Sequence, residues 1–279
     1  MSRMEIGFVC TNYNNSHFTR AAVESLIRGC GACPIIVVDN GSGQDSIRAL
    51  EELERSHENV TLVFSDKNVG YFRGLNIGIR AMREAYPAMG HIVVGNNDLV
   101  FPADFCDRIR ECAACFERSA VVSPDVVTLD GVHQNPHVIE SISWMRELLY
   151  DLYYTSYALA RSIRWLSRVT RRFTDRADES HWDVSGPIYQ GHGSCYVLGP
   201  LFFDNFDELW APSFLMGEEW FLSKQLKDVG MQVYYEPRIR VEHRCHGAVG
   251  QMPDRTMWEH GRDAHRVYRA HVGVFGQRV

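Results

Sequence analysis

Short apolar runs alternate with amphipathic helical patterns over residues 1–100 of this 279-residue chain. The runs are apolar throughout, which is typical of strands buried on both faces of a parallel sheet. We therefore expect an α/β protein with a mostly parallel central sheet flanked by helices, joined by right-handed crossovers. The expected strands cover 6–10, 34–39, 60–64 and 91–94, and the expected helices cover 21–28, 47–53 and 75–85.

The remaining residues predict further elements in a less regular order. They are a helix over 103–116, a strand over 120–123, a long helical stretch over 140–173 that breaks near Thr155, a glycine-rich turn into a strand at 191–198, a helix over 218–227, a strand over 231–235, a second one from Pro237 to His243, and a helix over 255–270. We expect one domain over 1–250, made of a half over 1–100 and a half over 101–250, and a helical tail over 251–279.

The composition argues against several classes of protein. The formal net charge of −6 disfavours general binding to nucleic acid, which needs a basic surface. No apolar run approaches the roughly 18–20 residues that cross a bilayer. The first five residues lead directly into a strand pattern and do not resemble a signal peptide. We expect a cytoplasmic protein.

Eight cysteines in a chain of this length do not suggest a disulfide framework. The pairs Cys30-x-x-Cys33 and Cys112-x-x-Cys115 leave zinc binding as a minor alternative. Reduced, partly buried thiols are the favoured interpretation.

The helical stretch over 140–173 combines an apolar stripe with several arginines. One interpretation is peripheral contact with the inner face of an anionic membrane, or with a lipid-linked acceptor. The other, which we favour from the sequence, is a helix packed on the domain with its basic face in solvent.

Polar residues follow three of the expected strands in the first half. Asn96, Asn97 and Asp98 come directly after the strand over 91–94. Open α/β sheets bind their ligands at the carboxyl ends of strands. A carboxylate there suits Mg2+ or Mn2+ bridging two phosphates, so Asp98 is the expected metal ligand.

The two other strand ends point to a nucleotide. Asp39 could accept hydrogen bonds from a base or a ribose, although Asp-Asn-Gly-Ser also forms a good turn. After the third strand, the helix start near Gly70 and the guanidinium of Arg73 could receive phosphate. Neither GxGxxG nor a Walker lysine is present, which disfavours dehydrogenases and P-loop enzymes.

These motifs together resemble the family 2 glycosyltransferases of the GT-A fold, and within them the bacterial rhamnosyltransferase-like enzymes. The resemblance rests on Thr11-Asn-Tyr-Asn14, Asp39-Asn-Gly-Ser42, Asn68-Val-Gly70 through Asn76-x-Gly78, Asn96-x-Asp98, Phe206-Asp-Glu208, Gly217-Glu-Glu-Trp-Phe-Leu222, and Tyr235-x-Pro237 through Val241-x-His243. It covers roughly residues 4–120 and 190–250 and leaves 130–185 uncovered.

The resemblance implies roles for named residues. The donor site would comprise Thr11, Tyr13, Asp39, Asn68, Gly70, Arg73, Asn76, Asn96 and Asn97. Asp98 and His243 would bind the metal. Glu219 would be the catalytic base, with Glu218 as the alternative.

The implied reaction moves a hexosyl or deoxyhexosyl group, with inversion, from a UDP-, dTDP- or GDP-linked donor to an acceptor hydroxyl. The implied acceptor is a glycan or a lipid-linked molecule, and the implied role is synthesis of cell-surface polysaccharide or another glycoconjugate. Two alternatives remain open, a sugar nucleotidyltransferase and a catalytically silent protein that binds nucleotide-sugars.

Overall fold

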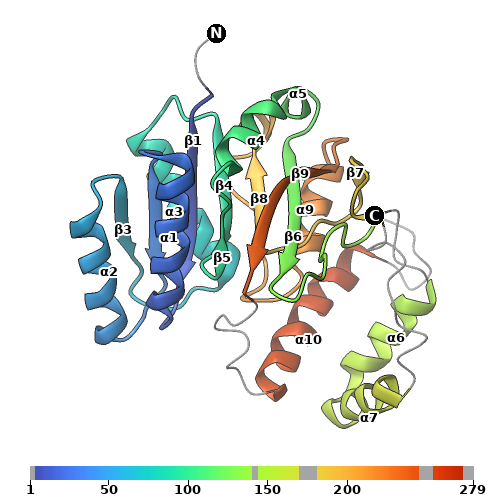
Figure 1. Ribbon diagram of the computed structural model, residues 1–279. Helices are drawn as coiled ribbons and strands as arrows, with labels where there is room; N and C mark the ends of the chain where they lie inside the picture. Colours follow the sequence, from blue (N-terminus) through green and yellow to red (C-terminus); the bar gives the residue numbers. More distant parts are fainter. Residues whose placement is uncertain (1–3, 140–143, 170–180, 245–253, 273–279) are drawn as a thin grey trace.

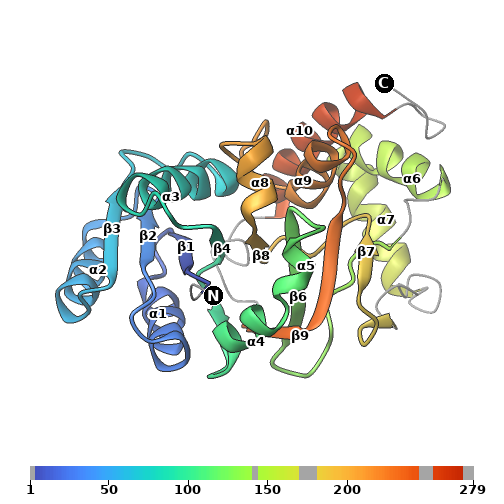
Figure 2. The same cartoon turned by 90° about the horizontal axis from the view of Figure 1, so that it is seen from above.

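The computed structural model describes residues 4–139, 144–169, 181–244 and 254–272. At its centre is a nine-stranded sheet with the strand order β3-β2-β1-β4-β8-β6-β9-β5, to which β7 is added beside β9. Figure 1 shows the sheet with its helices, and Figure 2 shows α3, α8 and α9 on one face and α1 and α4 on the other. The predicted class, an α/β fold with a mostly parallel sheet flanked by helices, is confirmed.

The first half of the chain forms the parallel part of the sheet. Its elements are β1 (Ile6–Asn12), α1 (Ser16–Cys30), β2 (Ile35–Asp39), α2 (Gln44–Ser56), β3 (Val60–Phe64), α3 (Tyr71–Ala85) and β4 (His91–Asn96). Strand β1 pairs in parallel with β2 and β4, and β2 pairs in parallel with β3. These strands therefore all end at one edge of the sheet.

The second half adds strands of both directions. Its elements are β5 (Leu99–Val100), α4 (Phe105–Glu111), α5 (Ala113–Phe116), β6 (Val121–Thr128), α6 (Trp144–Thr155), α7 (Tyr157–Val169), β7 (Gly186–Ile188), β8 (Cys195–Leu198), α8 (Pro200–Asn205), α9 (Glu218–Lys227), β9 (Val233–His243) and α10 (Asp254–His271). Strand β8 is antiparallel to β4 and β6, β9 is parallel to β6, and β5 and β7 are antiparallel to β9.

Several predicted boundaries differ from the structure. The strands predicted on either side of Pro237 form one strand, because the β6–β9 pairing skips from Glu236 to Arg240 and leaves the proline outside the ladder. The helix predicted over 103–116 is divided at Cys112. The stretch over 140–173 breaks at Ser156, next to the predicted position, while 140–143 and 170–173 lie outside the described residues, as do 251–253 and 273–279.

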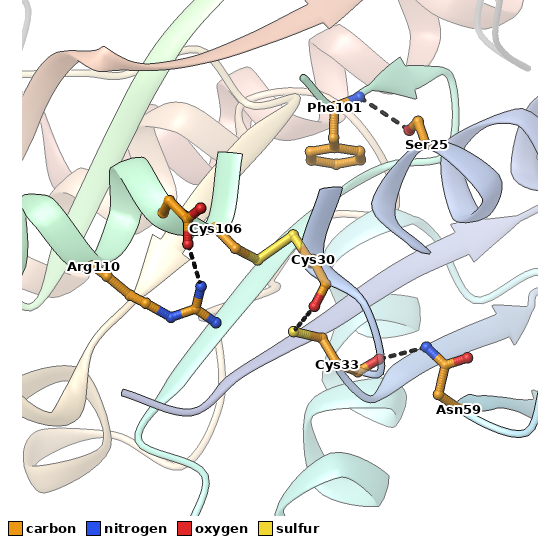
Figure 3. The surroundings of a disulfide bond; sticks show 8 residues. Ser25, Cys30, Cys33, Asn59, Phe101, Cys106 and Arg110 are labelled. Carbon is orange, nitrogen blue, oxygen red and sulfur yellow. Dashed lines mark hydrogen bonds and ion pairs between the residues drawn. A yellow bond between two sulfur atoms is a disulfide. The ribbon is translucent and has the colours of Figure 1, made fainter. Parts of the chain in front are cut away.

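The cysteine prediction was wrong for one pair. Cys30 and Cys106 form a disulfide with a Cα–Cα distance of 5.4 Å. Figure 3 shows how the last residue of α1 meets α4 there, with Cys33 close by. The partner of Cys30 lies 76 residues away, so the local Cys-x-x-Cys spacing could not reveal it. Cys33 instead contacts the carbonyl oxygen of Cys30.

Apolar side chains fill both faces of the sheet. Leu26, Leu50 and Phe105 belong to the cluster between the sheet and the helices α1, α2 and α4. Leu75 and Phe202 belong to the cluster on the opposite face. With both faces covered, the strand ends are the places left for polar side chains to meet. None of the helices in the described parts of the chain is long and apolar enough to cross a membrane.

Helix α3 packs against the sheet through Gly78. A Cβ atom at this position would lie 2.3 Å from a methyl carbon of Val9 and 2.9 Å from one of Val38, both within the buried sheet. We expect Gly78→Ala to lower the free energy of unfolding by about 1–3 kcal/mol, the range typical of overpacked cores.

Urea unfolding followed by circular dichroism measures this change. Gly186→Ala is the matched control, because a Cβ there meets nothing within 4 Å. We expect the control to stay within about 0.5 kcal/mol of the parent protein. Equal unfolding midpoints for the two variants would contradict the packing argument.

Candidate active site

A cavity of about 530 Å³ opens where β1, β2 and β4 end. Residues from both halves of the chain line it. They are Thr11, Tyr13, Asn15, Asn40, Asn68, Gly70, Tyr71, Asn96, Asn97, Asp98, His192, Gly193, Ser194, Phe214, Leu215, Met216, Glu218, Glu219, His243, Asp254 and Met257.

The cavity gathers most of the residues singled out in the sequence. Those that line it are Thr11, Tyr13, Asn68, Gly70, Asn96, Asn97, Asp98, Glu218, Glu219 and His243. Asp39, Arg73 and Asn76 are not part of the lining. The expected metal ligand and the expected base thus share one cavity although they come from opposite halves of the chain.

Asp98 and His243 meet across the junction of the two halves. Strand β5 pairs with the end of β9 so that Leu99 lies opposite His243. The Nε2 atom of His243 lies 3.3 Å from Oδ1 of Asp98, and both side chains are buried. The backbone N–H of Arg244 donates to the carbonyl oxygen of Asp98 at 3.0 Å, which fixes this register.

Gln134 lies against one ring nitrogen of His243. Its Oε1 atom lies 2.7 Å from Nδ1 of His243. Since an amide oxygen only accepts, Nδ1–H donates to it, and in the neutral ring the lone pair of Nε2 is then directed at Asp98. A cation between Nε2 and Oδ1 of Asp98 would be bound by both atoms, so these two side chains can serve as its ligands.

The donor set fits a cation that also needs phosphate oxygens. Within the described residues, no three histidine, cysteine or acidic side chains gather in an arrangement that could hold a metal by themselves. Mg2+ and Mn2+ are commonly held by one or two protein ligands together with substrate phosphates and water. Asp98 and His243 could supply such a pair, and a ring nitrogen is more favourable for Mn2+ than for Mg2+.

Two acidic side chains begin helix α9 and face the cavity. The Oε1 atom of Glu218 accepts a hydrogen bond from the backbone N–H of Met216 at 3.0 Å. Burial, and then the negative charge of Glu219, raise the pKa of Glu218 to about 8. Met216 has a φ of 73°, a left-handed conformation that is uncommon outside glycine. This turn sets the direction from which both carboxyl groups enter the cavity.

Glu219 contacts the loop that precedes β8. Its Oε1 atom accepts a hydrogen bond from the backbone N–H of Gly193 at 3.3 Å. A Cβ atom at Gly193 would come within 2.7 Å of that oxygen, so a larger residue here would displace the carboxylate of Glu219. The hydroxyl of Tyr71 donates to the carbonyl oxygen of Gly193 at 3.1 Å. Glu219 is also the less buried member of the acidic pair.

The cavity wall formed by the first half of the chain is held by side-chain amides. The Nδ2 atom of Asn40 donates to Oδ1 of Asn68 and to the carbonyl oxygen of Gly70, both at 3.1 Å. Asn97 is fixed in the same way by Asn15 and Thr19, each 2.7 Å away. Rigid polar walls of this kind offer hydrogen-bonding groups in fixed positions for a polar ligand.

Gly70 is where the wall approaches the segment before α9. Its φ is 95°, and a Cβ atom there would lie 2.0 Å from the carbonyl oxygen of Phe214. Only glycine fits, and the N–H of Tyr71 can then donate to that same oxygen at 3.2 Å. The start of α3 and residues 214–216 thereby form one side of the cavity.

Three residues expected in the donor site point elsewhere. The carboxylate of Asp39 accepts hydrogen bonds from Asn12 and from the backbone N–H of Ser42, so it stabilises its own turn. Arg73 donates to two backbone carbonyl oxygens at residues 211 and 212, both at 3.1 Å. Asn76 is buried and bonded to the backbone of Leu209 in both directions. To reach a ligand, Arg73 and Asn76 would have to leave these partners, whereas the carboxylate oxygens of Asp39 can accept further hydrogen bonds.

Other lining residues were not predicted from the sequence. Tyr71, Asn40 and residues 214–216 belong to this group, as do Asp254 and Met257 of α10. Asn40 stood inside a recognised motif and could have been found there. The segment 254–257 carries no motif, and only the packing of α10 brings it to the cavity.

A family model described as "Glycosyl transferase family 2" matches residues 8–169, which is more than half of the chain. The chain belongs to glycosyl transferase family 2. The matched range includes β1 to β4 and the Asn96–Asp98 turn. The search among curated proteins gave no match for this family 2 enzyme.

Two solved structures are similar to this glycosyl transferase in fold. One is GalNAc-T7 with UDP, GalNAc and Mn2+, with a TM-score of 0.57 and 12% identity, covering 87% of this chain and 44% of the other. The other is S. aureus TarS, with a TM-score of 0.56 and 9% identity, covering 86% of this chain and 37% of the other. The chain thus spans less than half the length of either protein.

Glu218 makes the stability of the fold depend on pH. Its raised pKa means that the folded protein binds this proton more tightly than the unfolded chain. The resulting stabilisation is fully present at low pH and is lost as the pH rises towards about 8. We expect the free energy of unfolding to fall by up to roughly 1.4 kcal/mol per pH unit over this window, relative to a Glu218→Gln variant.

Urea unfolding of the parent protein and of Glu218→Gln, at several pH values between about 5 and 8, tests this linkage. Glu58→Gln is the control, since Glu58 is exposed and its profile should follow that of the parent protein. If the free energy of unfolding changed with pH in the same way in the parent protein and in Glu218→Gln, Glu218 would not be the group that binds this proton.

Proposed function

We propose that this family 2 enzyme transfers a sugar from a nucleotide-diphosphate donor to an acceptor hydroxyl, with inversion at the sugar carbon. The observation that carries the proposal is the shared cavity of Asp98, His243 and Glu219. A diphosphate would be bound on one side of this cavity and a proton acceptor would stand on the other. The similar fold of GalNAc-T7, solved with UDP and Mn2+, supports the choice of donor.

Asp98 and His243 would hold Mn2+ or Mg2+ together with the donor's phosphates. Such a cation, when bound, neutralises the charge that develops on the departing diphosphate. Gln134 would keep the Nε2 lone pair of His243 available for this purpose by accepting a hydrogen bond from Nδ1–H. The amides of Asn40 and Asn68, with Thr11 and Tyr13, would contact the nucleoside.

Glu219 is the better candidate for the base. Inverting transfer needs a group that takes the proton of the acceptor hydroxyl while the hydroxyl attacks. A protonated Glu218 cannot do this, and its raised pKa favours the protonated form. Glu219 is less buried and is held against Gly193 at the cavity wall. The protonated Glu218 would then hold the start of α9 through its contact with Met216.

The proposal also specifies the classes of sugar and acceptor and the biosynthetic role. The motif resemblance to rhamnosyltransferase-like enzymes favours a hexose or deoxyhexose donor linked to UDP, dTDP or GDP. The proposed acceptor is a glycan or a lipid-linked molecule, in the synthesis of a cell-surface polysaccharide or another glycoconjugate.

Glu219→Gln should separate binding from turnover. We expect turnover to fall by about 10²–10⁴-fold, the usual contribution of a general base, because the amide cannot accept the proton. Donor binding should remain, since Gln keeps the size and the contact with Gly193. The measurement is release of nucleoside diphosphate from UDP-, dTDP- and GDP-sugars with Mn2+, together with a thermal-shift screen of the same compounds.

Glu51→Gln, an exposed change in α2, is the control for this assay. Release of pyrophosphate from a nucleoside triphosphate and a sugar phosphate would support a nucleotidyltransferase instead. Thermal stabilisation by a nucleotide-sugar without any turnover would support a silent binding protein. Full activity of Glu219→Gln would show that Glu219 is not the catalytic base.

The assigned role of Gln134 predicts an effect on metal affinity. We expect Gln134→Ala to weaken Mn2+ binding by about 10–100-fold, because the ring of His243 loses the partner that orients it. Gln134→Glu keeps an acceptor opposite Nδ1 and should retain the affinity. Mn2+ titration by electron paramagnetic resonance, with the most stabilising nucleoside diphosphate present, provides the measurement. Gln44→Ala is an exposed control, and equal Mn2+ affinity in Gln134→Ala would contradict the assignment.

A further inference from the structure

Helix α6 turns its acidic side towards the protein and its apolar side towards solvent. Glu147 is only 3% exposed, and its Oε2 atom lies 2.9 Å from Arg269 of α10. Asp151 also contacts Arg269, and it lies 2.8 Å from Nε2 of His265. A helix packed on a soluble domain normally buries its apolar side. The polar interior of this contact leaves the apolar side without cover in the described residues.

The outward side of α6 consists of large apolar residues at helical spacing. Their exposures lie between 46% and 63%, and they are Trp144, Met145, Leu148, Leu149 and Leu152. The apolar residues of α6 therefore lie largely in solvent, although α6 itself is packed on the domain through Glu147 and Asp151.

Helix α7 continues the surface and adds positive charge. Trp165 is 68% exposed and Leu166 is 56% exposed. Arg161, one turn before Trp165, lies on the same exposed side. The sequence over 157–169 contains three arginines and no acidic residue. We call the exposed sides of α6 and α7 together the α6–α7 face.

The α6–α7 face is distinct from the rest of the exposed apolar surface. Apart from Tyr150, also in α6, the other large exposed apolar side chains of the described residues lie outside α6 and α7, at Phe64, Tyr86, Leu129, Val132, Trp182, Val184 and Val229. Scattered residues of this kind are ordinary, whereas a contiguous apolar surface marks an interaction site.

Helix α10 links this face to the active-site cavity. Its first turn contributes Asp254 and Met257 to the cavity lining. Its last turns carry His265 and Arg269, which hold α6. In Figure 1, α6, α7 and α10 lie together at the lower end of the molecule, towards which β1 runs. A partner on the α6–α7 face would thus lie at the end of the molecule towards which β1 runs, near the helix that lines part of the cavity.

We propose that the α6–α7 face docks onto a bilayer containing anionic phospholipids, with both helices lying in the plane of the interface. Exposed leucines would enter the acyl boundary, and Trp144 and Trp165 would lie at the headgroup level that tryptophan prefers. Arg161 would face the anionic headgroups.

Charge favours a membrane over a second copy of the chain. A two-fold contact through this face would bring the exposed Arg161 of both copies into one interface, and α7 offers no acidic residue to pair with it. Arg164 already lies 3.6 Å from Asp254 of α10. The two acidic residues of α6 are engaged by α10. An anionic lipid surface would supply a countercharge for Arg161.

Vesicle co-sedimentation of the full chain tests the docking. We expect binding to vesicles of phosphatidylglycerol and phosphatidylcholine, and binding at least about tenfold weaker to phosphatidylcholine alone. Leu148→Ser/Leu149→Ser should weaken binding to the anionic vesicles by about tenfold or more. Leu129→Ser/Val229→Ser, an equally exposed apolar pair elsewhere, should bind like the parent protein.

A second variant and its control test the electrostatic contribution to vesicle binding. Arg161→Glu should weaken binding to anionic vesicles by about tenfold, while Arg48→Glu, an exposed change in α2, should have little effect. Thermal unfolding of each variant confirms that it folds. Brominated phosphatidylglycerol should quench tryptophan emission in the parent protein, and much less in Trp144→Phe/Trp165→Phe, which still co-sediments.

Three outcomes would overturn the proposal. The first is no binding to either vesicle type. The second is binding that Leu148→Ser/Leu149→Ser and its control weaken equally. The third is a concentration-dependent dimer that only Leu148→Ser/Leu149→Ser abolishes, measured by analytical ultracentrifugation without vesicles, which would make the face a protein–protein interface. None of these results bears on the donor chemistry, because the variants lie outside the cavity.

Discussion

The pairing of β5 with the end of β9 is the constraint on which the site depends. Two residue pairs, Leu99 with His243 and Val100 with Glu242, join the turn after β4 to a strand from the other half of the chain. Successive side chains of a strand point to opposite faces, so a slip of one residue would turn His243 away from Asp98. The β6–β9 ladder, with its break around Pro237, carries β9 to this register.

The cavity combines this register with a costly set of buried polar groups. Asn40, Asn97 and Gln134 each satisfy another polar group near the cavity, and none of them would be stable there without its partners. A network of this kind stabilises one geometry rather than the fold as a whole. Glu218 and Glu219 also differ because of their surroundings. The two carboxyl groups are adjacent in sequence, but Glu218 is the more deeply buried of the two.

The sequence predicted the fold class and most of the cavity because both follow from local patterns. Apolar runs and strand-end motifs are readable in a window of a few residues, and parallel strands necessarily end together. Contacts between distant segments were out of reach. The Cys30–Cys106 disulfide, the Gln134–His243 contact and the arrival of α10 all depend on tertiary packing. Asp39 and Arg73 stay predictions, and the structure adds that each of them also makes hydrogen bonds to backbone groups of the protein.

Helix α10 gives the two proposals a common geometry. One end of this helix contributes to the cavity wall, and the other end neutralises the acidic side of α6. The inverted arrangement of α6 follows from that ionic contact, because a helix that must present Glu147 and Asp151 to Arg269 cannot also bury its leucines there. If the exposed leucines rest on a bilayer, an acceptor anchored in the same bilayer needs to travel only along the surface to reach Glu219. The polar interior of the α6–α10 contact would then serve to orient the enzyme, rather than to stabilise it.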